Sequence, residues 1–428
     1  MDQGLGQRRD YIVAGVASMV GTTIEWYDFF LYGTAAALIF NKLFFPAFDP
    51  LTGTLAAFAT YAVGFLARPL GAVVFGHFGD RVGRKSMLMV TLVLMGLPTM
   101  AIGLIPTYQT MGYGAAILLV LMRFLQGMAV GGEWGGAALM AVEHAPPGRK
   151  ALFGSLPQAG VGAGLILSSL AMAAVAKLPE ADFLQWGWRL PFLASVLLLA
   201  VGAFIRLRVA ESPAFAALKD SGRQHDKPVL EVFRRYPREV LTAACARLAE
   251  TVWFYTVVTF ALSYSTQQLG FPKPQVLSAI VAGAALSLLT IPAAGWLSDR
   301  MGPQRVYMLG AGVLCGAAFV FFALLATREP VLLYVAMLLA VGVVFPLLYA
   351  PESALFAAQF PAEVRYSGIS LCVQLAGAVG GGAAPLVATS LLAVGGGSPH
   401  WISLYLVALG LLALYCASRM RSVHGEHV

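Results

Sequence analysis

The stretch Gly76–Lys85 reads GHFGDRVGRK and joins two long apolar segments. A partial copy, Gly295–Arg305 (GWLSDRMGPQR), begins 219 positions later and also lies between apolar segments. A second pair of landmarks, Arg149–Gln158 and Arg365–Gln374, has the same spacing between its arginine and its glutamine. Copies at matching places in the two halves of the chain predict an internal duplication.

The composition excludes an ordinary soluble protein. Of 428 residues, 59% are hydrophobic and 11% are charged, whereas soluble domains carry about 25% charged residues. Apolar stretches of 20 or more residues recur, and each is long enough to cross about 30 Å of hydrocarbon. The sequence therefore predicts an all-α polytopic membrane protein, and the net charge of +7 is typical of basic loops on one side of a membrane rather than of nucleic-acid binding.

We predict twelve transmembrane helices in two six-helix bundles. The N-terminal bundle covers residues 1–207, a cytoplasmic linker with room for a short surface helix covers 208–237, and the C-terminal bundle covers 238–428. The predicted spans are 11–40, 52–78, 86–106, 113–142, 150–176, 186–207, 238–268, 274–297, 306–326, 330–358, 366–394 and 400–419.

The distribution of lysine and arginine predicts the orientation. With these spans, 20 of the 28 basic residues lie at the termini, in the loops that follow even-numbered helices or at the helix ends beside these loops, and Arg206 is counted with the linker. The opposite loops hold four, and four more lie within spans or at their ends. Basic loops stay on the cytoplasmic side, so both termini are predicted to be cytoplasmic, and the membrane is expected to be a bacterial inner membrane.

The charged loops are predicted to form a gate. An aspartate at the end of one helix can accept hydrogen bonds from the unpaired N–H groups at the N-terminus of another helix, and arginines beside it can pair with acids across the interface between the halves. The expected gate residues are Asp80, Arg81, Arg84, Glu143, Arg149, Asp299, Arg300 and Arg365.

These motifs resemble a known family. Gly76–Lys85 looks like the signature loop of the major facilitator superfamily, and Arg123–Gly127 (RFLQG) resembles its fourth-helix motif. The chain is further similar to the metabolite:proton symporter branch, and within it to bacterial shikimate transporters. The residues that carry this likeness include Glu25–Phe29, Arg68–Gly71, Gly127–Gly136, Trp186–Phe192, Arg365–Gly368, Gly53–Ala59, Phe75–Arg81, Gly131–Leu139 and Ala261–Gln267.

Some positions depart from the resembled pattern. The shikimate-type pattern has aspartate at the position of Glu25, and the branch often has an acid at the position of Ala358. The tenth helix, Val343–Phe360, matches poorly as a whole. Because the resemblance implies that this helix lines the central cavity, the departures bear on the identity of the substrate.

Acids inside predicted spans are candidates for proton coupling. A charge at the centre of a bilayer costs at least ~2.5 kcal/mol, and burial and nearby arginines shift a carboxyl pKa in opposite directions. We therefore expect Glu25, Asp28, Glu133 and Glu250 to include the proton site. The alternative is a set of structural ion pairs. For Glu352, a cavity acid and a helix-end cap remain equally open.

The candidate substrate ligands are polar residues on the helices that line the cavity in the resembled fold. The guanidinium fork of arginine suits a carboxylate, and glutamine and tyrosine can bond hydroxyl groups. The set is Arg123, Arg247, Gln126, Gln158, Gln374, Tyr32 and Tyr255. Arg68 is expected to pair structurally with Glu133 or Glu143 rather than to touch substrate.

The sequence and the resemblance together predict a proton-coupled symporter that imports a small carboxylate, shikimate or a similar hydroxy acid first. The alternatives are 2-oxoglutarate, citrate or another dicarboxylate, betaine or proline, and, ranked lower, an export antiporter. An enzyme is not expected, because the sequence contains no nucleophile–base pattern, metal-ligand cluster or phosphate loop. We expect a monomer in the lipid bilayer, no cofactor or metal beyond the coupling proton, and no nucleic-acid partner. Sodium coupling is left open.

Overall fold

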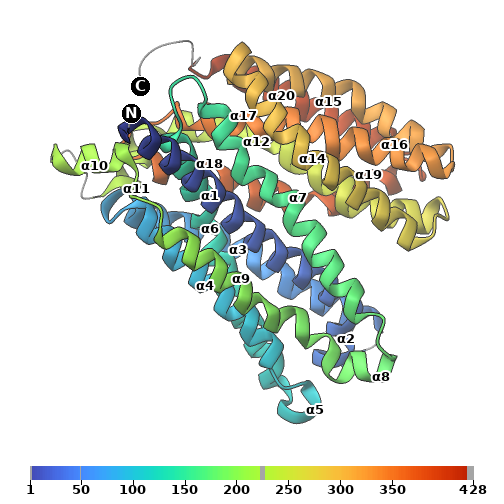
Figure 1. Cartoon of the computed structure of the whole chain (residues 1–428). Coiled ribbons are helices and arrows are strands. Elements are labelled where there is room, and N and C mark those ends of the chain that lie inside the picture. Colours follow the sequence, from blue (N-terminus) through green and yellow to red (C-terminus); the bar gives the residue numbers. More distant parts are fainter. Residues whose placement is uncertain (1, 49, 222–226, 422–428) are drawn as a thin grey trace.

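The computed structural model describes residues 2–48, 50–221 and 227–421, and within these ranges it contains helices and loops and no strands. Five residues of the predicted linker (222–226) and the end of the predicted C-terminal bundle (422–428) lie outside the described residues. Figure 1 shows the helices as two groups of long rods, one formed by each half of the chain.

The first half supplies six long helical segments, joined by short helices in the connections. The segments are α1 (Asp2–Ala35) continued by η1 (Ala36–Phe40) and α2 (Asn41–Phe44), α3 (Pro50–Arg81), α4 (Arg84–Leu104), α6 (Tyr113–His144), α7 (Lys150–Val175) and α9 (Arg189–Leu207). The connections contain α5 (Tyr108–Met111), α8 (Glu180–Asp182) and η2 (Phe183–Gly187).

The second half repeats this plan with more interrupted helices. Its segments are α12–η3–α13–η4 (Pro237–Tyr255, Thr256–Phe260, Ala261–Ser263, Tyr264–Gln268), α14 (Lys273–Met301), α15 (Pro303–Ala326), α16–η5–α17 (Pro330–Leu339, Ala340–Val344, Phe345–Ala357), α18–η6–α19 (Arg365–Ala376, Gly377–Gly381, Ala384–Val394) and α20 (His400–Arg419). The η segments are single π-helical turns, which often occur at functional sites. Two short helices, α10 (Pro213–Asp220) and α11 (Pro228–Arg235), connect the halves.

The prediction of twelve membrane helices is confirmed by this arrangement. Within the described part of the chain, ten helices are long and apolar enough to cross a membrane. The other two of the twelve are α1 and the run that begins with α12, and these carry the charged pairs Glu25 and Asp28, and Arg247 and Glu250. The same charges that mark a functional site therefore lower the apolar character of the two helices.

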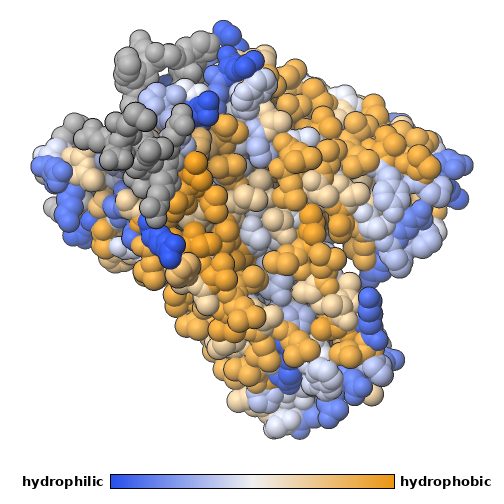
Figure 2. Space-filling model, in the orientation of Figure 1, coloured by the Kyte–Doolittle hydropathy of each residue, from blue (hydrophilic) through white to orange (hydrophobic). Residues whose placement is uncertain are grey.

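The two halves touch at one end of the molecule and diverge at the other. Figure 1 shows both chain ends, α10 and α11 at the same end, which we call the terminal face. Figure 2 shows an apolar belt across the middle of the molecule, polar residues at its two ends, and a notch between the halves at the end away from the termini. This shape fits a protein that spans a bilayer and is closed on the terminal face.

Small residues set how closely the helices of one half approach each other. A Cβ atom added to Gly71 on α3 would lie 1.9 Å from the backbone oxygen of Met128 on α6, and one added to Gly131 on α6 would lie 2.2 Å from the backbone oxygen of Arg68. Backbone atoms cannot rotate away as a side chain can, so the α3–α6 contact requires glycine at both positions. Close helix packing through small residues is the rule in membranes.

We expect Gly71→Ala to destabilise the fold by about 1–3 kcal/mol, because the added methyl group forces α3 and α6 apart. The matched control is Gly312→Ala on α15, where an added Cβ meets nothing within 4 Å and alanine favours the helix. Thermal unfolding of the two purified variants in detergent measures the difference. Equal midpoints for the two variants would contradict the packing argument.

Candidate functional site

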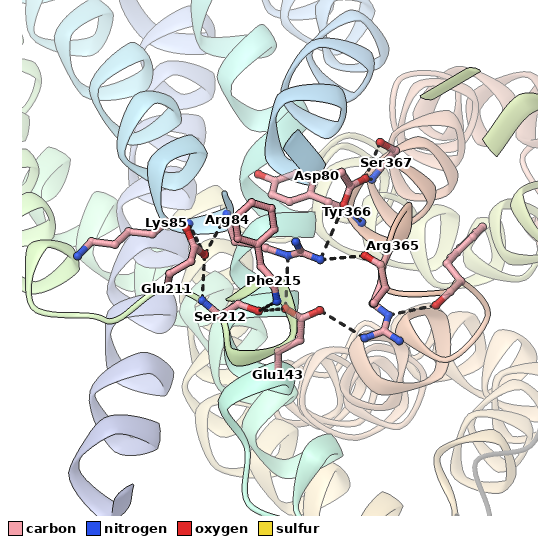
Figure 3. Close-up of polar contacts among 12 residues, drawn as sticks. Asp80, Arg84, Lys85, Glu143, Glu211, Ser212, Phe215, Arg365, Tyr366 and Ser367 are labelled. Carbon is pink, nitrogen blue, oxygen red and sulfur yellow. Dashed lines mark hydrogen bonds and ion pairs between the residues drawn. The ribbon is translucent and has the colours of Figure 1, made fainter. Parts of the chain in front are cut away.

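The first charged loop closes the terminal face through Asp80. This residue, at the end of α3, is 1% exposed. Its carboxylate accepts hydrogen bonds from the backbone N–H groups of Tyr366 (3.2 Å) and Ser367 (2.9 Å) and from the Ser367 hydroxyl (2.8 Å) at the start of α18, as Figure 3 shows. The expected contact between an aspartate and the N-terminus of a helix in the other half is therefore present.

A buried ionic network surrounds this contact. Glu143 at the end of α6 forms an ion pair with Arg365 of α18 at 3.3 Å, and this pair joins the two halves. Arg84 lies 3.4 Å from Glu143 and donates to the backbone oxygen of Ala362 at 3.1 Å. The expectation that Arg84 pairs with an acid across the interface is thus wrong, because its acid belongs to its own half and its contact with the other half is a carbonyl.

The second charged loop makes the matching contact with fewer bonds. Asp299 on α14 accepts from the backbone N–H groups of Ala151 (2.8 Å) and Leu152 (2.9 Å) at the start of α7. The same end of the molecule is thus closed twice, by pseudo-equivalent aspartates that lie on opposite halves. Among the other predicted gate residues, Arg81, Arg149 and Arg300 are exposed, and Arg300 stacks 4.0 Å from the ring of Trp296 on its own helix.

The linker takes part in the gate, which sequence reasoning missed. Glu211, just before α10, accepts from the backbone N–H groups of Arg84 (3.1 Å) and Lys85 (3.2 Å) and so caps the start of α4. The Ser212 hydroxyl donates to Glu143, and the ring of Phe215 lies 4.9 Å from the Arg84 guanidinium, all visible in Figure 3. The sequence does contain a signal for α10. Ser212 followed by Pro213 is typical of the start of a helix.

A cavity lies between the two halves, about midway along the helices. Its volume is about 40 Å³, which is room for water rather than for an organic acid, so a substrate requires the halves or their side chains to move. Both halves contribute to its wall. The lining residues include Glu25, Trp26, Arg68 and Trp134 from the first half and Arg247, Glu250, Phe254, Tyr255, Tyr349 and Gln374 from the second.

A second, smaller cavity within the first half adjoins a polar chain. The Thr99 hydroxyl donates to Asp28 at 2.7 Å, and the Gln126 amide donates to Thr99 at 2.6 Å. Arg123 donates to Gln126 at 3.3 Å and lies 4.4 Å from the ring of Tyr32. Four of the predicted site residues, Glu25, Asp28, Arg123 and Gln126, thus line one cavity together with Arg68. Tyr32 does not line it and packs against Arg123.

The position of Arg68 corrects an expectation. Glu133 and Glu143, its expected partners, pair with other arginines, and within the described ranges Arg68 forms no ion pair with an acid. It lines both cavities, is 8% exposed, and lies 4.3 Å from the ring centre of Phe65. A buried guanidinium that is held by aromatic rings and has no carboxylate partner is suited to an anionic ligand.

Arg247 is already neutralised by acids of its own half. It forms an ion pair with Glu352 of α17, and its Nη2 lies 3.8 Å from Glu250. The ring of Trp134, from the other half, lies 4.6 Å from its guanidinium. Glu352 is fully buried inside α17 and lines neither cavity, so it is neither a cap at a helix end nor an acid of the cavity wall.

The remaining predicted residues divide between the cavity and the helix interiors. The Gln374 amide donates to the Val130 backbone oxygen across the halves at 3.2 Å and lines the central cavity. Gln158 lines neither cavity, and both polar atoms of its buried amide lack a partner within the described structure. Glu133 also lines neither cavity, because it pairs inside the first half with Arg206, a residue assigned above to a loop.

Comparison with known proteins agrees with this fold. The family model described as Major Facilitator Superfamily matches residues 18–385 and 253–425. The shikimate transporter of Escherichia coli (strain K12) is 42% identical over 411 residues, which cover 95% of this chain and 94% of that protein. The proline/betaine transporter of the same strain is 34% identical over 375 residues, covering 85% and 75%.

The solved structure of the proton:xylose symporter XylE bound to 6-bromo-6-deoxy-D-glucose superposes with a TM-score of 0.78 over 97% of each chain, at 14% identity. The chain belongs to the major facilitator superfamily. It is a multi-pass membrane transporter and not an enzyme, and the cavity between its halves is where such a fold holds its substrate.

Proposed function

We propose that the protein is a proton-coupled symporter for a small carboxylate, shikimate or a similar hydroxy acid. The observation that supports this most is Arg68, a buried cation that lines both cavities and has no acid within ion-pair distance in the described structure. Burying an unpaired charge is costly, and a carboxylate substrate supplies the missing partner. The 42% identity to a shikimate transporter suggests which acid to test first.

The other predicted ligands then orient the substrate around this anchor. Arg123 lines the smaller cavity and Arg247 lines the central one, and a substrate carboxylate at Arg247 takes the place of Glu352 or Glu250 there. Gln126 and Gln374 offer amides for hydroxyl groups, and Tyr255 adds a phenol to the wall of the central cavity. Such a set of a few convergent polar groups in a largely aromatic pocket is the usual form of a small-molecule site.

The coupling proton is assigned to acids at the cavity wall. Glu25 lines both cavities, and one of its buried carboxylate oxygens has no hydrogen-bond partner in the described structure. One oxygen of Asp28 is likewise buried without a partner. Glu250 accepts from Thr251 at 3.1 Å beside Arg247. A carboxyl that alternates between solvent and an arginine changes its proton affinity, so substrate on the arginines and a proton on Glu25 or Asp28 favour each other.

The latches of Asp80 and Asp299 supply the alternating step. They hold the terminal face shut, and we propose that this face lies in the cytoplasm, because the loops there carry most of the lysine and arginine. Substrate and proton then enter from outside and leave when the latches part. The bacterial relatives support an inner-membrane location. We propose a monomer that needs no cofactor or metal besides the proton.

Uptake into proteoliposomes tests the proposal. We expect an imposed inward proton gradient to raise uptake of radiolabelled shikimate at least about tenfold over uptake without a gradient, and unlabelled shikimate to block it. Dicarboxylates such as 2-oxoglutarate and citrate serve as competitors. A gradient response to another acid alone would keep the symporter and change the substrate. Equal uptake with and without the gradient would contradict proton symport and favour sodium coupling or antiport.

A zwitterion such as betaine is the second candidate, because aromatic rings surround the central cavity. Trp26 lies 5.9 Å from Phe254, which lies 4.9 Å from Phe345, and all three line the cavity. Aromatic walls of this kind bind quaternary ammonium groups, and one relative is a proline/betaine transporter. Inhibition of labelled shikimate uptake by betaine at comparable concentrations is the result expected of this candidate.

A further inference from the structure

A buried acid–arginine pair lies inside the first half, away from both cavities. Glu133 of α6 is 0% exposed and Arg206 of α9 is 3% exposed, and they form an ion pair. The Thr91 hydroxyl of α4 donates to the Glu133 carboxylate at 2.6 Å, and Arg206 also donates to the Leu88 backbone oxygen. Four helices thus meet at this pair, counting α1, which Figure 1 shows beside α4, α6 and α9.

Helix α1 connects this pair to the cavity acid. Ser18, Gly21 and Glu25 have i, i+3, i+7 spacing and share one face of α1. Gly21 sits directly over the pair, since an added Cβ would lie 1.7 Å from Arg206 Nη2 and 2.9 Å from Glu133 Oε1. Glu25, one turn further from the terminal face, lines both cavities and has a buried carboxylate oxygen with no partner in the described structure.

A small cavity lies on the other side of the pair, with the polar groups of Ser18, Lys85 and Arg206 set among apolar side chains. It has a volume of about 10 Å³, about the size of one water molecule. Ser18, Lys85, Leu88 and Arg206 are among its lining residues. The buried Ser18 hydroxyl has no hydrogen-bond partner in the described part of the chain, as expected of a group that bonds water. Lys85 donates to the Leu207 backbone oxygen at 3.0 Å and is partly exposed at the terminal face.

We propose that these residues form a proton route through the first half, separate from the path of the substrate between the halves. The proton passes first from Glu25 at the cavity to Glu133, which pairs with Arg206 one helical turn nearer the terminal face. It then passes to the water-sized cavity at Ser18, which leads to Lys85. Substrate leaves through the parted latches, and the proton leaves through the interior of the first bundle. This inference rests on the proposed proton symport.

The transfer balances without any other reactant. Protonated Glu25 gives its proton to the Glu133 carboxylate, directly or through water, and Glu25 becomes a carboxylate again. Neutral Glu133 then weakens its pairing with Arg206, passes the proton to water beside Ser18, and the ion pair re-forms. In the structure Arg206 and the Thr91 hydroxyl both contact the Glu133 carboxylate, so the route is blocked until this pair opens, which prevents a proton leak while the terminal face is closed.

The competing explanation is an ion pair that only fixes α9 against α6. The two explanations differ when both charges are removed together. A structural pair can be replaced by neutral side chains of similar size with little loss, whereas removal of one partner leaves a buried charge. A proton station cannot be replaced in this way, since glutamine does not take up and release a proton. The double variant therefore separates a positioning role from proton transfer.

The experiment compares wild type, Glu133→Gln and Glu133→Gln with Arg206→Gln in proteoliposomes that contain a pH-sensitive dye. Two quantities are measured: exchange of labelled for unlabelled shikimate at equal pH, which needs no net proton release, and inward proton movement on addition of shikimate. We expect exchange within about threefold of wild type in both variants, and substrate-driven proton movement at least about tenfold lower in both. Ser18→Val, which fills the small cavity, should slow proton movement several-fold with exchange unchanged.

The outcomes separate the two proposals. If the wild-type protein exchanges shikimate but shikimate drives no proton movement, proton symport is overturned, and this route with it. If shikimate drives proton movement in the wild-type protein and drives it equally well in the double variant, the route is overturned while proton symport stands. Glu133 and Arg206 are then a structural pair. If Glu133→Gln alone fails to fold, the double variant, which leaves no unpaired charge, still decides the question by the same two measurements.

Discussion

Replacement of Arg68 by glutamine is expected to raise the KM for the carboxylate substrate at least about 100-fold. Arg68 lines both cavities, and its guanidinium lies 4.3 Å from the ring centre of Phe65 and 5.0 Å from that of Phe29. The rings fix its position, so little side-chain entropy is lost on binding. Each hydrogen bond to a charged group contributes about 1.5–3 kcal/mol, and a 100-fold change corresponds to about 2.7 kcal/mol.

Two further variants sharpen this test. Arg68→Lys keeps the charge but lacks the planar fork, so we expect an intermediate loss of about tenfold. Arg305→Gln removes an exposed arginine from the first turn of α15 and should leave uptake unchanged. Initial rates of shikimate uptake over a range of concentrations give KM for all three. A wild-type KM in Arg68→Gln would show that the substrate carboxylate lies against another cation, Arg123 or Arg247.

The gate was the part of the site that sequence predicted best. Asp80 and Asp299 occur at matching places in the two copies of one motif, and helix starts have unpaired N–H groups, so a contact between them follows from local chemistry and the repeat. The two aspartates indeed contact the first residues of α18 and α7. The duplication extends further, since Glu133 and Glu352 are also 219 positions apart and both are fully buried in ion pairs.

The choice of partner inside each bundle was not predictable in the same way. Helical spacing tells which residues share a face, but it does not tell which neighbouring helix that face meets. Arg68 and Arg206 were therefore both misassigned: Arg206 lies at the end of α9, where a count of basic residues treats it as a loop charge, yet it turns inward to Glu133. Glu211 was overlooked because its role depends on where the linker returns along α4.

Asp80→Ala is expected to open the terminal face and to reduce transport at least about tenfold. The variant removes three hydrogen bonds between Asp80 and the start of α18, together with a negative charge at the positive end of that helix. A loss of about 2–4 kcal/mol from the closed state shifts the ratio of closed to open molecules roughly 30- to 1000-fold. Substrate added from the side opposite the terminal face binds only to molecules whose terminal face is closed. The apparent affinity for that substrate therefore falls in proportion to the fraction of closed molecules.

Spin labels on the terminal face measure this opening. Val82 at the end of α3 and Met301 at the end of α14 are 54% and 41% exposed and belong to different halves. With cysteines at these two positions and the four native cysteines replaced, electron–electron distance measurements should show a longer distance in Asp80→Ala than in the parent.

Asp299→Ala should give a smaller shift, because Asp299 makes two bonds to α7 where Asp80 makes three to α18. If the distance distribution in Asp80→Ala matches the parent, while Arg365→Gln lengthens it by removing the ion pair with Glu143, the closed state depends on the ionic network and not on the helix contact. The order of the three variants therefore ranks the contacts that hold the terminal face shut, and it distinguishes a latch carried by the repeated motif from one carried by the salt bridge between Glu143 and Arg365.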